Sequence, residues 1–201
     1  MSGYHDLRGR SVESTEVCHM PLFGRKKSKY EQAAELLTEG EVDQAITMLE
    51  ELLEVEPENT NARVTLAVAL LERQDEATME SPDTKRVFML LDEAAEMAPA
   101  DPVSHFNRGV CLRKLDKPEA ALDSFQAALD IDEQQPLAVL HMAEINYELE
   151  RWDEAIELAR RALVMDPGFE ASMGWVRDAL RQAGRLDAGK NVIEKEASPD
   201  G

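Results

Sequence analysis

Apolar residues recur at helical spacing from Tyr30 to Ala197, and the alternation of apolar and polar residues that is typical of strands is absent. The pattern therefore predicts an all-α chain of short helices. Turn-forming residues separate two helices within a pair, and prolines separate one pair from the next. The turns within pairs are marked by Gly40, Asp116, Glu150 and Gly184, and the breaks between pairs by Pro57, Pro99 and Pro167.

Residues at equivalent places in these pairs repeat every 34 positions. The spacing joins Ala121 to Ala155 and Gly189, Phe125 to Ala159, and Ala128 to Ala162. Pro57 and Pro99 are 42 residues apart, which is the same unit with eight residues added. Two amphipathic helices cannot bury both of their apolar faces alone, so the fixed period predicts that each pair stacks on its neighbours.

Small residues mark the places where helices approach closely, and larger ones fill the space between pairs. The small ones are Ala33, Ala67, Gly109 and Ala143 in first helices and Ala45, Ala121 and Ala155 in second helices, and the larger ones include Leu49, Leu91 and Phe125. Residues 107–132 and 143–167 show the pattern best. It resembles the tetratricopeptide repeat (TPR) family, whose unit is a helix-turn-helix of 34 residues. The resemblance implies an α-solenoid of about five units that forms a right-handed superhelix.

The array occupies residues 26–201 and follows a flexible basic leader at 1–25. We set its units at 26–59, 60–101, 102–135, 136–169 and 170–201.

Two of the units depart from the pattern. The second contains eight extra residues within 73–85, which we interpret as a lengthened turn, and Ser81-Pro82 is expected to restart its second helix. In that helix Val87 replaces the usual small residue. The last unit has Arg177 where a small residue is expected and Gly189 where alanine is usual, so we expect a degenerate capping unit.

The acidic charge lies almost entirely after the leader. The chain has 22 Lys and Arg against 41 Asp and Glu, a net charge of -19. Residues 1–29 have six basic and three acidic residues, so +3, whereas residues 30–201 have 16 basic and 38 acidic residues, so -22. An acidic body repels nucleic acid and is not attracted to anionic lipid, because both need Lys and Arg. We therefore exclude nucleic acid as a partner of the array.

The N-terminal region has no apolar run typical of a secretory signal, and no stretch approaches the roughly 18 uncharged apolar residues of a membrane span. We expect a cytoplasmic protein, with peripheral membrane association as a weak alternative.

No group of residues predicts catalysis or metal binding. Cys18 and Cys111 lack the spacing of a zinc site, and the only histidines are His5, His19, His105 and His141. His105 and His141 lie on adjacent first helices, but without a third ligand they are expected to serve packing and surface contacts. We therefore expect no enzyme, no metal site and no cofactor.

The resemblance also implies where a partner binds. In this family the first helices line a concave groove that holds a peptide or a partner helix. Carried onto this chain, the groove also includes Asn107. Its floor holds Tyr30, Val64, Val68, Phe106, Val110, Leu140 and Tyr147, and its walls hold Arg113, Lys114, Glu72, Glu144 and Glu148. We expect an apolar anchor on the floor and an acidic side chain at Arg113 and Lys114. The alternative is that the apolar residues merely complete the core.

The family's two-carboxylate clamp, used by chaperone cofactors, needs Lys and Asn at set places in three adjacent units. Only Asn107 matches here, so a clamp for the acidic tails of large chaperones is not expected. The predicted function is a protein–protein interaction scaffold or adaptor. The alternatives are an assembly or chaperone-like factor that shields an apolar client segment, and a non-catalytic regulatory subunit of an enzyme complex.

A second hypothesis concerns the end of the leader, where Leu22-Phe23 precedes Arg25-Lys26-Lys27. This apolar and basic segment is suited to docking in the groove of its own chain or of a neighbour, with self-association through residues 20–29. The alternative is a solvated tail or a weak membrane contact. Met20 is a second candidate start of translation besides Met1.

Overall fold

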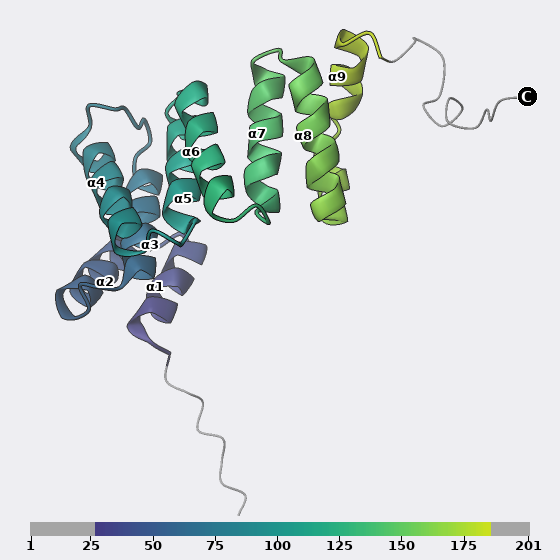
Figure 1. Ribbon diagram of the computed structural model, residues 1–201. Helices are drawn as coiled ribbons and strands as arrows, with labels where there is room; N and C mark the ends of the chain where they lie inside the picture. The colour runs from purple at the N-terminus through teal and green to yellow at the C-terminus, as the bar shows by residue number, and fades with distance from the viewer. Residues whose placement is uncertain (1–26, 186–201) are drawn as a thin grey trace, which may run out of the picture.

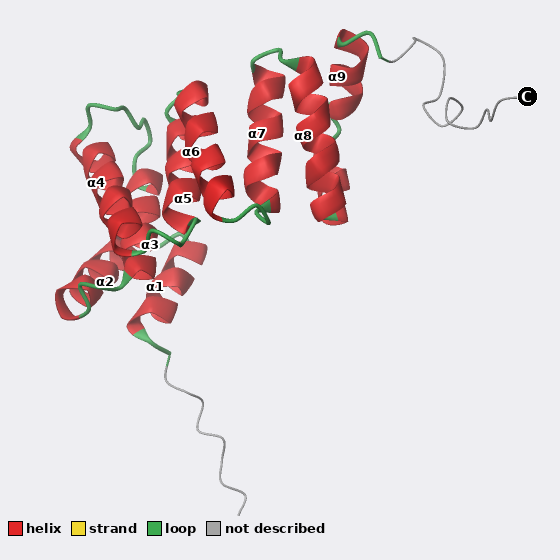
Figure 2. Ribbon diagram, viewed as in Figure 1, coloured by secondary structure: helices red, strands yellow, loops and turns green. Residues whose placement is uncertain are grey.

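The computed structural model describes residues 27–185, and this part of the chain contains helices and turns but no strand (Figure 1, Figure 2). The all-α architecture expected from the sequence is confirmed. Four helix pairs follow one another: α1 (Lys29–Thr38) with α2 (Val42–Val55), α3 (Thr60–Glu72) with α4 (Pro82–Met97), α5 (Val103–Lys114) with α6 (Pro118–Ile131), and α7 (Pro136–Glu148) with α8 (Trp152–Met165). A 3-10 helix (Pro167–Ser172) and α9 (Val176–Gln182) complete this part. The leader at 1–25, residue 26 and Gly189 lie outside the described residues.

Three of the turns within pairs, and the turn that follows α9, share one conformation, at the four residues that the sequence marks. The φ angle is 82° at Gly40, 55° at Asp116, 59° at Glu150 and 68° at Gly184. After each of these residues a backbone N–H donates to a carbonyl five residues back: Glu41 to Leu36 (2.8 Å), Lys117 to Leu112 (2.9 Å), Arg151 to Asn146 (2.8 Å) and Arg185 to Leu180 (2.9 Å). These bonds satisfy carbonyls that the helix end leaves free, as in the Schellman motif.

Replacing Glu150 by glycine is expected to raise the free energy of unfolding by about 0.5–1 kcal/mol. A left-handed φ strains a side chain with a Cβ, and this gain exceeds the entropy that glycine adds to the unfolded chain. Urea denaturation followed by circular dichroism measures the change. As a control, Gln126→Gly in the exposed middle of α6 is expected to cost about 1 kcal/mol. Equal losses for the two variants would contradict the prediction.

The extra residues of the second pair form the connection between α3 and α4. Ser81 caps α4 as predicted: its Oγ accepts the N–H of Thr84 at 3.1 Å, and Pro82 is the first helical residue. The Thr84 hydroxyl, which is fully buried, donates to Gln74 Oε1 at 3.1 Å. The cap is therefore tied back to the segment that follows α3.

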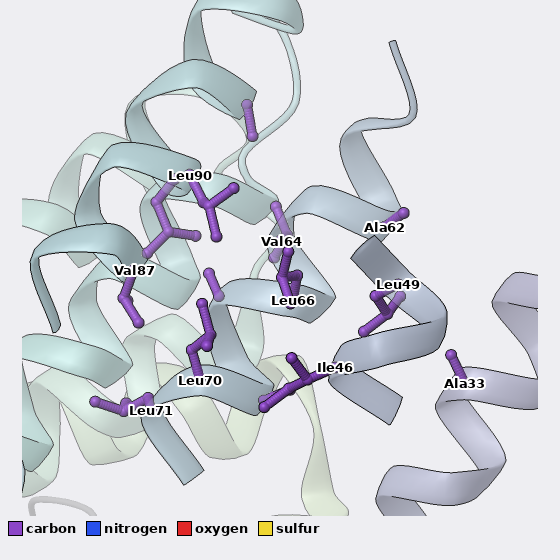
Figure 3. Packing of buried hydrophobic residues seen from close by; sticks show 14 of the residues in the cluster. Ala33, Ile46, Leu49, Ala62, Val64, Leu66, Leu70, Leu71, Val87 and Leu90 are labelled. Carbon is purple, nitrogen blue, oxygen red and sulfur yellow. The ribbon is translucent and has the colours of Figure 1, made fainter. Parts of the chain in front are cut away.

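The core consists of two clusters that meet at Phe88, which packs against both. The first is built by α1 to α4 together with Cys111. Figure 3 shows Leu66 and Leu70 of α3 between the labelled side chains of α2 and α4. Val87, the exception to the small-residue pattern, is fully buried in this cluster. The second cluster runs from Leu112 to Met173.

Ion pairs at equivalent places join second helices to the pair that follows. Each links an acidic residue in the first turn of a second helix to an arginine shortly after the next first helix: Asp43 to Arg73 (3.8 Å), Glu119 to Arg151, and Asp153 to Arg185 (2.7 Å). Exposed pairs of this kind each stabilise by less than about 1 kcal/mol. Their recurrence fixes the placement of one pair on the next more than it adds stability.

Candidate partner-binding surface on the first helices

The helices α1, α3, α5, α7 and α9 form what we call the first-helix surface. Within this surface, α1 packs against α3, and α3 packs against α5. A polar contact also joins each first helix to the next: the Tyr30 hydroxyl to Thr65 Oγ1 (3.3 Å), Lys114 Nζ to the Leu71 carbonyl (3.2 Å), Arg113 to Glu144 (2.5 Å) and the Tyr147 hydroxyl to Asp178 Oδ2 (3.2 Å). The surface is thus held together by its own side chains.

The N-terminal part of this surface is apolar. Tyr30 of α1, Val68 of α3, and Phe106 and Val110 of α5 are all partly exposed. Phe106 also packs inward, with its ring centroid 5.6 Å from that of Phe125. Four apolar side chains from three successive first helices are therefore open to contact.

Two residues expected on the groove floor lie in the core instead. Val64 and Leu140 are each 7% exposed, and each belongs to one of the two core clusters. At these positions neighbouring helices already cover the side chain, so the alternative of core packing applies to them. Neither offers appreciable surface to a partner.

The C-terminal part of the surface is charged and paired internally. Nη1 of Arg113 lies 2.5 Å from Glu144 Oε2 and 2.9 Å from His141 Nδ1, and Nη2 lies 2.5 Å from Glu148 Oε1. We call these four residues the Arg113 cluster. It joins α5 to α7.

The pKa values within the Arg113 cluster reflect this pairing. Burial alone would lower the pKa of the Arg113 guanidinium, but its hydrogen bonds to Glu144 and Glu148 outweigh burial and the pKa is raised. The pKa of Glu144 is lowered because the His141 ring and the Arg113 guanidinium lie against its carboxylate, and their effect outweighs that of burial. Arg113 therefore stays charged and stays engaged.

The remaining polar residues predicted for the groove also have partners within the chain. The exposed Lys114 donates to the Leu71 carbonyl at 3.2 Å, and the Asn107 amide donates to the Val103 carbonyl of its own helix at 2.8 Å. Arg113 and Lys114 are therefore not two unoccupied cations waiting for an acidic side chain. A partner carboxylate at either position has to compete with an existing bond.

Tyr147 lies at the C-terminal end of the surface among aromatic rings that the sequence reasoning did not include. Its ring centroid is 4.9 Å from Trp175 and 5.4 Å from Trp152. Burial and the hydrogen bond to Asp178 raise the pKa of Tyr147. The 34-residue period could have placed these residues on the surface. Asp178 stands one period after Glu144, and Trp175 stands one period after His141.

The one cysteine among the described residues, Cys111, is buried. Burial raises the pKa of the Cys111 thiol to about 12, which keeps the sulfur protonated and unreactive. Residues 27–185 contain no group of three or more His, Cys, Asp or Glu that could hold a metal ion. Across the same residues, no helix is both long enough and apolar enough to span a bilayer.

Comparisons with known proteins agree with this architecture. Models of the tetratricopeptide repeat match residues 36–77, 102–135 and 137–171. Among solved structures, TTC0263, a thermophilic TPR protein of Thermus thermophilus, is 22% identical and superimposes with a TM-score of 0.64 over 76% of this chain and 80% of its own. A crystal structure of MamA is 18% identical, with a TM-score of 0.60 over 78% of this chain and 81% of its own. At these identities the likeness shows the fold.

A curated relative, the protein STIP1 homolog of Dictyostelium discoideum, is 29% identical over 110 residues, which are 55% of this chain and 19% of the relative. The chain thus spans about a fifth of the length of that relative. The repeats support a protein-interaction scaffold in general terms, and proteins built from them are typically non-catalytic. Together the matched repeats and the paired helices show that this chain belongs to the tetratricopeptide repeat family.

Proposed function

We propose that the chain is a scaffold or adaptor that holds a peptide or helix of a partner protein against the apolar part of the first-helix surface. The observation that carries the proposal is the run of partly exposed apolar residues on α1, α3 and α5, namely Tyr30, Val68, Phe106 and Val110. Contiguous apolar surface is costly to leave in water and is typical of binding sites.

The charged residues Arg113 and Lys114 have a secondary role in binding the partner. Breaking the bonds of Arg113 or Lys114 within the chain costs about as much as a new bond to a partner gains. Apolar burial on α1, α3 and α5 therefore supplies the affinity, whereas the Arg113 cluster aligns polar groups at the edge of the bound segment. The acidic array disfavours strongly acidic segments throughout.

The test uses the full chain as bait in three variants beside the wild type. Val68→Glu and Val110→Glu place a charge on the proposed surface, and Val164→Glu places the same charge on the end of α8, where valine is 80% exposed. Circular dichroism checks that all four proteins are folded. Captured proteins are quantified by isotope-labelled mass spectrometry.

We expect both surface variants to lose the wild-type partners by about tenfold or more, the size typical of a residue that dominates an interface, and Val164→Glu to retain them. Wild-type yields for both Val68→Glu and Val110→Glu would refute the proposal. A stable stoichiometric complex favours a scaffold or regulatory subunit, whereas capture only before a complex is complete favours an assembly factor.

A further inference from the structure

A pocket of about 430 Å³ lies where the chain enters α1. It is lined by Ser28, Lys29 and Tyr30 at the start of α1, by Leu52 and Val55 in the last turn of α2, and by Glu56, Asn59 and Asn61 after it. We call it the entry pocket. Val55 is 76% exposed although it is a valine, and Leu52 beside it is only 5% exposed. The pocket thus has an apolar side that nothing in residues 27–185 covers.

Glu56 lines the entry pocket, and the sequence around it is strongly acidic. Residues 51–58 include Glu51, Glu54, Glu56 and Glu58, and no basic residue occurs between positions 51 and 62. The last turn of α2 has no basic side chain, and the C-terminal end of a helix carries partial negative charge that favours cations. Lys29 already pairs with Glu51 at 3.0 Å. The pocket therefore suits an apolar group that is followed by positive charge.

We propose that Leu22 and Phe23 of the same chain occupy the entry pocket, with Arg25 and Lys26 against the glutamates around it. The segment has the required order, two large apolar residues and then basic ones. Phe23 precedes Ser28, which lines the pocket, by five residues, and five extended residues reach about 17 Å. Closing so short a loop between Phe23 and Ser28 costs little conformational entropy. The entry pocket shares Tyr30 with the proposed partner site, but the inference does not rest on binding of a partner there.

The experiment replaces Phe23 in the full chain by the photoreactive benzoylphenylalanine. After irradiation at low protein concentration, mass spectrometry locates the cross-linked residues. We expect products of monomer mass with cross-links concentrated in residues 52–61. Val55→Asp is expected to lower the yield of these products by about fivefold, because it removes the apolar contact with Leu22 and Phe23. The added carboxylate does not repel the basic residues, so a fall in yield reports the apolar contact.

The matched control is Val164→Asp at the end of α8, where the valine is 80% exposed and the substitution is the same. This variant is expected to keep the full cross-link yield. Three results would each overturn the proposal: equal yields for Val55→Asp and Val164→Asp, cross-links concentrated on α3 and α5, or products mainly of dimer mass. The second would place the segment on the first-helix surface, and the third would assign it to a second copy of the chain.

Discussion

Replacing Phe125 by alanine is expected to lower the free energy of unfolding by about 3–5 kcal/mol. The side chain is fully buried in α6. Its ring stacks on His141 with centroids 5.2 Å apart and meets Phe106 edge-on at 5.6 Å. Truncation removes these contacts and leaves a cavity that the surrounding helices fill only in part. Guanidinium denaturation followed by circular dichroism measures the loss.

Gly109 provides the control, because it faces the same ring. A Cβ added at Gly109 would lie 2.8 Å from Cδ1 of Phe125, so Gly109→Ala is expected to destabilise the wild type although alanine is favoured over glycine in a helix by about 1 kcal/mol. In the Phe125→Ala background the added methyl group enters free space, and the same change is expected to stabilise. A loss below about 1 kcal/mol for Phe125→Ala, or the same sign for Gly109→Ala in both backgrounds, would contradict this packing.

Periodicity predicts the core of this fold well, because close helix packing leaves little choice of side chain. Ala121, Ala128, Ala155 and Ala162, which the 34-residue spacing aligns, are all fully buried. The same spacing pairs Phe125 with Ala159, and both lie in the core. Small residues recur at most of the places where backbones approach, and Val87 is the fully buried exception in the second pair.

The turns could also be predicted, even without glycine. Asp116 and Glu150 adopt the same left-handed conformation as Gly40. Their place between two apolar stretches marks the turn, because the bond from the next residue back to the helix end requires this geometry whatever the side chain.

The first-helix surface is harder to predict, because periodicity tells which residues share a helix face but not how far the next pair covers that face. Val64 and Tyr30 occupy equivalent places in their units, yet Val64 is buried while Tyr30 is partly exposed. Val64 is covered because α3 lies between two neighbouring pairs, whereas α1 stands at the end of the described array. The exposure of an apolar residue on a first helix therefore depends on its unit.

The pairing of Arg113 with Glu144 and Glu148 could have been predicted from the sequence. Its acidic partners lie 31 and 35 residues further along the chain, close to one repeat. A charge on one first helix meets the charges about one period away, in the same manner as the apolar residues. Applied to charges as well, the 34-residue period predicts an internally satisfied cluster here.

Replacing Arg113 by methionine is expected to lower the free energy of unfolding by about 1.5–3 kcal/mol, the usual range for hydrogen bonds to charged groups. The substitution keeps apolar bulk but leaves Glu144, whose side chain is 25% exposed, without its guanidinium partner. It also removes the bonds that join α5 to α7. Urea denaturation at neutral pH measures the loss. Glu148→Gln is the control: its side chain is 52% exposed, so its pairing with Arg113 is screened by solvent and the loss is expected below about 1 kcal/mol.

The dependence on pH separates this ion pairing from packing. The folded pKa of Glu144 is lowered by His141 and Arg113, so the stability that this group contributes is fully present above its unfolded pKa of about 4.3 and is lost as pH falls through the lower folded value. Arg113→Met removes one of the two causes. The difference in stability between wild type and variant is therefore expected to shrink as the pH is lowered from about 7 to about 3. A difference that stays constant over this range would assign the effect of Arg113 to packing of its alkyl chain, and the ion pair would then contribute little to joining α5 to α7.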